Sequence, residues 1–568
     1  MHIDNYRRKL EAVFLFLIVF LLFCVARLLF IQFFRSDYLA SLAKKQHNLF
    51  VELEPLRGAI YDSNLKPLAV NILVDSVYTS PNALSNKDKQ KIVKLLPSIL
   101  NVDPAYLKDK LSRKKHFVWL SRKITPEQSE AIKKLDIKNV DFIKESKRCY
   151  PNGYLASHVI GFAGLDNKGL EGLELYYDSY LKGEAGWGLF LRDAKQTKLD
   201  LWEKMVLPKD GYDLVLTIDE VIQYIAEREL DKVFKQYKAK GACIIVMDPH
   251  TGAVLALAGR PTYDLNKYSS VSQDSRRNRL VCDMAEPGSV FKIITASAAL
   301  EENKLSEETK VFCENGAYKI ASHVLHDHRP HGILTFREVI EQSSNIGTSK
   351  IAQMLGEDTL YKYIRSFGFG SKTGIDLPGE ISGVVREPRY WSKISIATVP
   401  MGQEVGVTAL QLAGEISIIA NGGQLMKPYV VEEISDKSGE VIKEFYPVML
   451  NKVVSLDTAN RIKKILVGVV EKGTGRMAKM NDFTAAGKTG TAQKLEPNGR
   501  YSHSKFIGSF IGFAPAEDPV ISIVVMVDEP YPVYFGGVVA APVFKNVASD
   551  TLKYLRSKEM PGELCLDQ

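Results

Sequence analysis

The sequence predicts an α+β protein carried on a single N-terminal membrane helix, and three observations lead to this prediction. Residues 12–34 form an almost wholly apolar run, and about 20 helical residues are enough to cross a bilayer core. The rest of the chain alternates polar helix-like stretches with short apolar strand-like runs. A chain of 568 residues, of which 45% are hydrophobic and 25% charged, is long enough for two or more folded domains.

The apolar run is interpreted as a retained anchor with a cytoplasmic N-terminus. Three basic residues at positions 7–9 precede it, and positive charge favours the cytoplasmic side. Everything after the run is then expected outside the cytoplasm. A cleaved signal peptide is the alternative, but the run is long for one and the clearest cleavage-like site, 41–43, lies well past its end. Arg27, inside the run, either snorkels to the interface or faces a membrane partner.

Local patterns place further elements along the chain in order. Polar helices are expected at 86–96 and 126–134, and a strand at 214–217 is followed by a helix over 221–237. Apolar runs predict a hairpin formed by 242–247 and 253–257, because a turn sequence separates them. Two more strands are expected at 510–513 and 521–527, and a final helix over 541–555.

Charge, cysteine and histidine content argue against several functions. The net charge of +7 is modest for this length, and no basic stripe indicates a nucleic-acid partner. None of the six cysteines forms a close pair typical of zinc sites. Cys282 and Cys313 could lie near each other, although free buried thiols are favoured. Four histidines, His323, His326, His328 and His331, have a spacing compatible with a metal site, but a polar loop is preferred and no metal is expected.

Three short motifs occur in order along the chain. They are Ser289-Val290-Phe291-Lys292, Ser343-Ser344-Asn345 and Lys488-Thr489-Gly490-Thr491. Together they are typical of serine acyl-transferases that react with penicillin. Each is weak alone, because Ser-x-x-Lys also occurs at Ser41, Ser63, Ser112, Ser179 and Ser502, and a second Lys-Thr-Gly begins at Lys372.

Local context selects Ser289 among these serines. A breaker segment, 286–288, precedes it, and an apolar run up to Leu300 predicts a buried helix that begins at Ser289. The free N–H groups at a helix N-terminus favour a developing negative charge. Lys292 lies one turn later on the same face, and burial favours a neutral amine that can accept the serine proton.

Context likewise selects Lys488 over Lys372. Small residues surround 488–491, which lets a substrate approach the backbone closely, and two strand-like runs follow. The segment 372–374 instead runs into a loop sequence, so a structural role is predicted for it.

On these residues the chain resembles a class B penicillin-binding protein, a monofunctional peptidoglycan D,D-transpeptidase. Other segments match the family in order between residues 55 and 550: 57–62, 148–151, 158–161, 169–174, 216–219, 373–380 and 401–412. The resemblance implies a cytoplasmic tail (1–11), the membrane helix (12–34), a non-catalytic pedestal domain of the dimerisation type (35–211), a transpeptidase domain (212–557) and a tail (558–568). The transpeptidase domain is expected to have a central antiparallel sheet flanked by helices.

The resemblance also implies a role for each motif residue. Ser289 is the nucleophile and Lys292 the general base, while Ser343 passes a proton to the leaving nitrogen. Asn345 holds the substrate backbone, Lys488 supplies positive charge, and Thr489, Gly490 and Thr491 bind the substrate. The backbone N–H groups of Ser289 and Thr491 form the oxyanion hole. Peptidoglycan stem peptides are the expected substrates, β-lactams would acylate Ser289, and no metal or organic cofactor is needed.

The segments 159–174 and 402–408 more closely resemble division-type than elongation-type enzymes. This implies septal wall synthesis at the bacterial cytoplasmic membrane, a periplasmic catalytic domain, and a SEDS-family glycosyltransferase and divisome proteins as partners. The alternatives are an elongation-type transpeptidase, a β-lactamase, and a non-enzymatic sensor or scaffold. A long anchor and pedestal argue against a hydrolase, and residues 1–11 are too few for an intracellular signalling domain.

Overall fold

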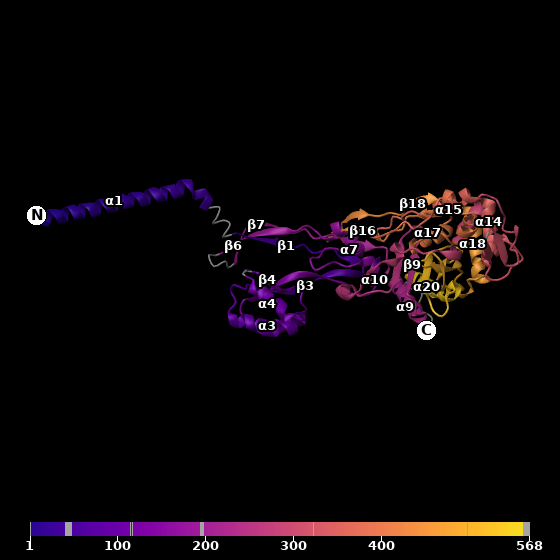
Figure 1. Ribbon diagram of the computed structural model, residues 1–568, viewed down its shortest axis with the longest axis horizontal. Helices are drawn as coiled ribbons and strands as arrows, with labels where there is room; N and C mark the ends of the chain where they lie inside the picture. The colour runs from indigo at the N-terminus through magenta and orange to yellow at the C-terminus, as the bar shows by residue number, and fades with distance from the viewer. Residues whose placement is uncertain are drawn as a thin grey trace. The chain divides into compact units, whose positions relative to one another are not determined.

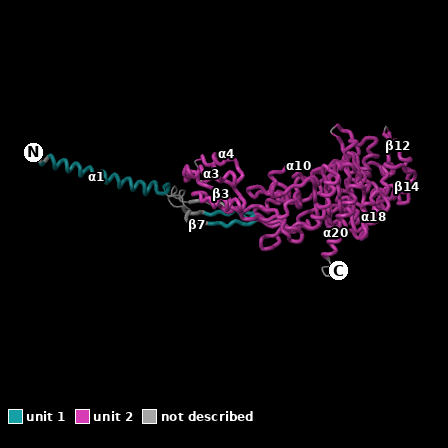
Figure 2. Tube along the Cα trace, turned by 90° about the horizontal axis from the view of Figure 1, so that it is seen from below, with its two compact units in different colours: residues 1–56, 183–210 teal, residues 57–182, 211–568 magenta. Residues whose placement is uncertain are grey.

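The computed structural model describes residues 2–39, 48–113, 115, 117–192, 198–321, 323–496 and 498–559. The chain divides into two compact units, coloured separately in Figure 2. Unit 1 combines residues 1–56 with 183–210, and unit 2 combines residues 57–182 with 211–568. Each unit is thus assembled from two separate stretches of the chain.

Unit 1 contains the apolar helix and a small sheet. Helix α1 runs from His2 to Phe34 (Figure 1). Its segment Asn5–Phe34 is the one helical stretch, among the described residues, that is long and apolar enough to cross a membrane. The strands are β1 (Asn48–Leu53), β6 (Gly186–Arg192) and β7 (Lys198–Val206), paired antiparallel in the order β1-β6-β7. The predicted run at 12–34 lies inside α1, which begins ten residues earlier.

A seven-stranded sheet in unit 2 joins early and late parts of the chain. Its strands are β2 (Ile60–Tyr61), β3 (Pro67–Thr79), β4 (Val118–Ser121), β5 (Val140–Cys149), β8 (Asp213–Leu216), β16 (Val431–Ser435) and β17 (Val441–Glu444). The order is β17-β16-β8-β2-β3-β4, with β5 also paired to β3. Strand β2 runs parallel to β8, with Ile60 opposite Leu214.

Three helices cover one end of this sheet around their own small core. Helices α3 (Asn86–Leu100), α4 (Pro104–Ser112) and α5 (Pro126–Lys134) bury leucine and isoleucine side chains against Val77. Ser85 and Thr125 cap α3 and α5 by accepting hydrogen bonds from backbone N–H groups of the first turn. Both predicted polar helices are therefore confirmed.

A buried ionic cluster connects three segments of the chain, those around residues 57, 148 and 174. Arg57 and Arg148 each donate from Nε to one carboxylate oxygen of Glu174, at 2.5 and 2.6 Å, and all three side chains are buried. Glu174 lies in helix α7 (Gly172–Tyr176), and Arg57 also donates to its backbone carbonyl. Segments around 57, 148 and 174 are thus tied together through one carboxylate.

The second large sheet of unit 2 is five-stranded and antiparallel, as predicted. Its strands are β9 (Gly241–Met247), β10 (Val254–Arg260), β19 (Ala486–Leu495), β20 (Tyr501–Ala514) and β21 (Ile521–Asp528), in the order β10-β9-β21-β20-β19. Helices α9 (Glu220–Gln236) and α20 (Ala541–Glu559) share a core with alternate residues of one face. The other face packs on α17 (Ala409–Ala420) and α18 (Leu456–Glu471), with α12 (Lys292–Glu301) beyond them.

The remaining elements of unit 2 surround these sheets. They are α6 (Ser157–Ile160), α8 (Asp178–Leu181), η1 (Leu265–Ser270), α10 (Gln273–Arg276), α11 (Arg279–Cys282), η2 (Gly288–Phe291), β11 (Lys310–Phe312), β12 (Ala317–Ile320), β13 (His323–His326), β14 (Ile333–Thr335), α13 (Phe336–Glu341), α14 (Asn345–Leu355), α15 (Glu357–Ser366), η3 (Pro388–Tyr390), α16 (Ser395–Thr398), η4 (Val399–Met401), β15 (Gln424–Met426), β18 (Met449–Lys452), η5 (Arg476–Ala478) and α19 (Gly536–Val539). The histidine segment is not entirely a loop: His323 and His326 lie on β13, which forms a hairpin with β12.

We predict that Glu174→Gln lowers the free energy of unfolding of unit 2 by about 3–5 kcal/mol, because the buried Arg148 loses its carboxylate partner and Arg57 keeps only Asp178. Asp109→Asn is the matched control. Asp109 pairs with Arg113 on an exposed helix surface at 2.6 Å, where loss of a pair costs about 0–1 kcal/mol. Urea denaturation followed by circular dichroism measures both, and equal small losses would contradict the prediction.

Candidate active site

Ser289 lies in a tight turn that leads directly into a buried helix. The 3₁₀ turn η2 begins at Gly288, whose φ is +61°, and Lys292 is the first residue of α12. All residues from Lys292 to Leu300 are buried, as the apolar run predicted. The α-helix proper begins three residues later than predicted, so Ser289 lies in the turn preceding it, where it is half-buried.

The turn is held by the backbone of a second loop. Gly288 donates its N–H to the carbonyl of Gly402 at 3.3 Å. A Cβ on Gly402, whose φ is +81°, would lie 2.3 Å from the Gly288 carbonyl oxygen, so only glycine fits there. Glu286 reinforces this contact, because its carboxylate accepts the Glu404 N–H at 2.8 Å and the Tyr501 hydroxyl at 3.0 Å.

Lys292 points its amine at the second motif. Its Nζ donates to the Ser343 carbonyl at 2.7 Å, to Ser343 Oγ at 3.2 Å and to Asn345 Oδ1 at 2.8 Å. The side chain is fully buried. Burial lowers the pKa of Lys292 to about 7, and the negative charge of Asp327 opposes the fall. The three donated hydrogen bonds use all three protons of the ammonium form, and burial favours its loss of one proton to give the neutral amine.

Ser343 joins this amine to a second one. Lys488 Nζ donates to Ser343 Oγ at 2.9 Å, and Lys488 is also fully buried. Burial, together with the charge of Lys292, lowers the pKa of Lys488 well below its ordinary value. Ser343 itself has φ +60°, a left-handed conformation that non-glycine residues rarely adopt and that is frequent at functional sites. One hydroxyl thus lies within hydrogen-bond distance of two buried amines.

The third motif is the edge strand β19, which packs on the Ser289 turn. A Cβ on Gly490 would lie 3.0 Å from the Pro287 carbonyl oxygen, so the strand and the turn approach closely at this point. Thr489 Oγ1 shares a hydrogen bond of 2.8 Å with Thr474, and Thr491 Oγ1 accepts the Gly536 N–H at 3.2 Å. Thr491 keeps its own hydroxyl proton available for a bound group.

The structure therefore brings the three motifs to one place. Lys292, Ser343, Asn345 and Lys488 are linked by direct hydrogen bonds, while Ser289 and Thr491 approach through the backbone of Gly288 and Gly490. The second Lys-Thr-Gly is elsewhere, in a loop closed by Glu380, whose carboxylate accepts from the Thr373 N–H at 2.6 Å. Cys282 and Cys313 are free thiols.

Sequence reasoning missed several supporting residues. Glu286, Asp327 and Thr474 contact the motifs or the turns that carry them. Asp327 lies in the histidine-containing segment 323–331. No local pattern marks these residues, because each acts on a partner far away in the sequence.

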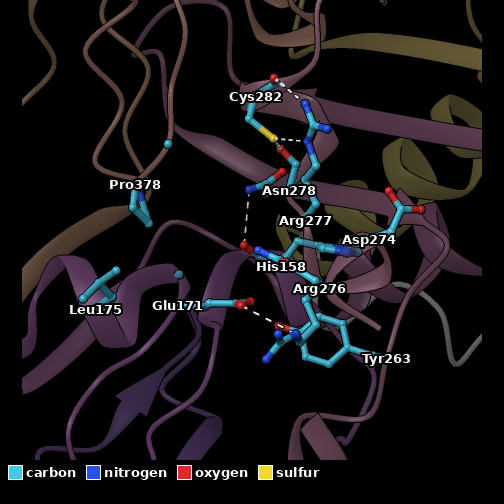
Figure 3. Close-up of a pocket in the computed structure, with 13 residues that line it drawn as sticks. His158, Glu171, Leu175, Tyr263, Asp274, Arg276, Arg277, Asn278, Cys282 and Pro378 are labelled. Atoms are coloured by element: carbon cyan, nitrogen blue, oxygen red, sulfur yellow. Dashed lines mark hydrogen bonds and ion pairs between the residues drawn. The ribbon is translucent and has the colours of Figure 1, made fainter. Parts of the chain in front are cut away.

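A separate cavity of about 530 Å³ lies away from these motifs. Helices α6, α7, α10 and α11 and the loop at Pro378 line it (Figure 3). Arg276 faces Glu171 across it, with Nε 3.7 Å from the carboxylate, and Arg277 Nε donates to Cys282 Sγ at 3.2 Å. Burial lowers the pKa of His158, on its wall, to about 4, so this histidine is neutral. None of the three-motif residues lines this cavity.

Two family models and several known proteins match this chain. The family model described as penicillin binding protein transpeptidase domain matches residues 242–549, and the model described as penicillin-binding protein dimerisation domain matches residues 52–216. Stage V sporulation protein D of Bacillus subtilis is 39% identical, over 98% of this chain and 87% of its own length.

Other relatives cover nearly the same span. Probable peptidoglycan D,D-transpeptidase PenA of Neisseria meningitidis is 34% identical over 94% of this chain and 90% of its own. Peptidoglycan D,D-transpeptidase FtsI of Escherichia coli is 30% identical over 94% and 89%. Penicillin binding protein 3 from Mycobacterium tuberculosis, solved with aztreonam, aligns with a TM-score of 0.70 at 28% identity, covering 89% of this chain and 97% of that one.

The chain therefore belongs to the penicillin-binding protein family. Because a dimerisation domain precedes the transpeptidase domain, it is a class B member. The family, the α+β fold class and the enzyme class predicted from the motifs are thereby confirmed.

We predict that Gly402→Ala abolishes most covalent labelling by a fluorescent penicillin, because its Cβ collides with the Gly288 backbone and displaces the Ser289 turn. A displacement of about 1 Å can cost roughly 100-fold in rate. Gly439→Ala is the matched control. Gly439 has a similar φ of +85°, and an added Cβ there meets nothing within 4 Å. Both variants carry the left-handed penalty of about 1–2 kcal/mol, so equal labelling of the two would refute the collision argument.

Proposed function

We propose that this chain cross-links peptidoglycan stem peptides as a serine-type D,D-transpeptidase, with Ser289 as nucleophile. The observation that carries this proposal is the buried Lys292–Ser343–Lys488 arrangement beside the Ser289 turn. Two amines with lowered pKa values, bridged by a hydroxyl, are suited to moving a proton away from one serine and toward a leaving group.

Acylation begins with the neutral Lys292 amine. It takes the Ser289 hydroxyl proton as Oγ attacks the carbonyl carbon of the penultimate D-Ala. The tetrahedral oxyanion is stabilised by the N–H groups of Ser289 and Thr491. The C–N bond then breaks, and the leaving nitrogen receives a proton through the Ser343 hydroxyl, which Lys292 re-supplies. Terminal D-Ala departs as a neutral amine, and the acyl group remains on Ser289.

Substrate orientation is assigned to β19 and Asn345. The terminal carboxylate binds between Lys488 and the hydroxyls of Thr489 and Thr491, and its negative charge favours the protonated form of Lys488. Gly490 has no side chain to obstruct the peptide, and Asn345 holds the substrate backbone. An amine from a neighbouring stem peptide attacks the acyl-enzyme, forms the cross-link and releases Ser289.

The wall process that we assign is septal synthesis. The resemblance of segments 159–174 and 402–408 to division-type enzymes supports it, as does similarity to the FtsI and PenA transpeptidases. One observation favours a second candidate, wall synthesis in sporulation: the relative at 39% identity is named Stage V sporulation protein D.

The placement in the cell is part of the same proposal. Helix α1 spans the cytoplasmic membrane once, with the basic residues 7–9 on the cytoplasmic side. Residues 35–211 form the pedestal and 212–557 the transpeptidase domain on the periplasmic side. A SEDS-family glycosyltransferase binds through the anchor and pedestal, within a divisome.

We predict that Ser289→Ala abolishes labelling of a 63.5 kDa band by fluorescent penicillin, because the acylated oxygen is gone. Ser112→Ala, the control, alters an exposed Ser-x-x-Lys serine outside the site and leaves labelling unchanged. Label that persists through a chase supports a transpeptidase, and rapid loss with release of hydrolysed drug identifies a β-lactamase instead. Labelling of the Ser289→Ala variant would refute the assigned nucleophile.

We predict that the second-order rate constant for acylation by a penicillin rises with pH up to about 7 and then levels off. The base acts only when unprotonated, and Lys292 loses its proton as pH rises through its pKa of about 7. Below that value the constant falls about tenfold per pH unit. Stopped-flow measurement from pH 5.5 to 9 provides the profile, and a flat or falling profile would exclude Lys292 as the base.

A further inference from the structure

The turn that carries Ser343 and Asn345 is held from outside by one carboxylate, that of Asp327. Its Oδ1 accepts the backbone N–H groups of Asn345 and Ile346, the latter at 3.0 Å. Its Oδ2 accepts the Ser344 hydroxyl at 2.7 Å. Asp327 directly follows strand β13, so these bonds connect the β12–β13 hairpin to the start of α14.

These bonds complete the N-terminus of α14. Ser344 is the N-cap residue, and its Oγ accepts only the Gly347 N–H, at 2.9 Å, from the backbone of the first turn. The N–H groups of Asn345 and Ile346 would otherwise lack a protein acceptor, and Asp327 supplies it. Carboxylates at this end of a helix are also favoured by the helix dipole.

The same segment fixes the side chain of Asn345. Its Nδ2 donates to the His326 carbonyl at 3.0 Å, which turns Oδ1 toward Lys292 at 2.8 Å. Ser343, two residues before Asn345, has a left-handed backbone conformation. Such a conformation is strained and persists only where surrounding contacts hold it in place. The two residues 326 and 327 therefore constrain both acceptors on which the Lys292 amine depends.

We propose that Asp327 is a positioning residue of the acylation machinery, which aims Ser343 Oγ and Asn345 Oδ1 at Lys292 by holding the backbone between them. This inference rests on the proposed roles of Ser289 and Lys292, and it adds a residue outside the three motifs.

Asp327 also acts on the charge balance of the site. Lys292 is faced by the uncharged Ser343 and Asn345 from the α13–α14 turn, by Lys488 from β19, and by the negative charge of Asp327. Near Asp327 itself lies the buried Cys313 thiol, 3.4 Å from Ser344 Oγ, whereas Lys350 of α14 is paired with Glu314. Loss of the Asp327 charge alone therefore makes Lys292 easier to deprotonate.

Two substitutions separate position from charge. Asp327→Asn keeps an oxygen that accepts both N–H groups but removes the charge, whereas Asp327→Ala removes both. Glu314→Gln is the matched control, because Glu314 binds α14 through Lys350 at 2.5 Å and does not contact the turn. For each purified full-length variant, stopped-flow acylation by a penicillin gives the rate of acylation, the encounter constant and their pH profiles, alongside thermal unfolding.

With Asp327→Ala, the rate of acylation is expected to fall by about 10–100-fold, with a smaller change in the encounter constant. Asp327→Asn is expected to recover most of the rate above pH 7 and to move the midpoint of the profile to lower pH, because the charge that favours protonated Lys292 is gone. Glu314→Gln should match the parent protein in rate and midpoint.

A rate and midpoint like those of the parent protein in both Asp327 variants would overturn the inference. So would a loss in Asp327→Ala that follows only the fraction unfolded, with no shift of midpoint in Asp327→Asn. Should Asp327→Ala not fold, Asp327→Glu keeps the charge but displaces the accepting oxygens; it is expected to lose rate without a shift of midpoint, and a rate like that of the parent protein would overturn the inference. If the parent protein itself is not acylated at Ser289, the proposed function fails, a result distinct from every outcome above.

Discussion

Two fully buried lysine amines share one partly buried serine hydroxyl, and the proposed chemistry of this protein depends on that arrangement. Lys292 and Lys488 both reach Ser343 Oγ, and both are fully buried. Burying an ammonium group is expensive without a paired charge, so the site favours neutral amines over a pair of cations. The site therefore carries little positive charge, and a proton can move between Lys292, Ser343 and Lys488 through their hydrogen bonds.

The segments that carry these residues are held close together by contacts between backbones. Gly288 lies against Gly402 on one side, and Gly490 lies against Pro287 on the other. Side chains at these glycines would push the turn, the loop and the strand apart. Gly288, Gly402 and Gly490 are thus explained by the close approach of three segments, from which the candidate catalytic side chains project.

The sequence predicted the elements that carry a local pattern. The three motifs, the long apolar N-terminal helix and the strands at 510–513 and 521–527 were identified because period, composition or spacing reveals them within a short window. Asp327 was not identified, because its role depends on hydrogen bonds from residues 344–346, and no short sequence pattern reveals these bonds. The contact between Gly288 and Gly402 was missed for the same reason. The seven-stranded sheet was not predicted either, because β2 and β8 pair across a long stretch of chain.

That discontinuous sheet makes the order of synthesis matter. The second edge of strand β8, at residue 213, stays unpaired until β16, at residue 431, has been synthesised. Likewise, β1 at residue 48 has no partner until β6, at residue 186, has been synthesised. A nascent chain emerging N-terminus first therefore carries unpaired strand edges for most of its elongation. Contacts so distant in sequence form slowly, and exposed edges invite wrong partners in the meantime. The seven-stranded sheet is therefore completed only after residues 431–435 have been made, more than 200 residues after β8.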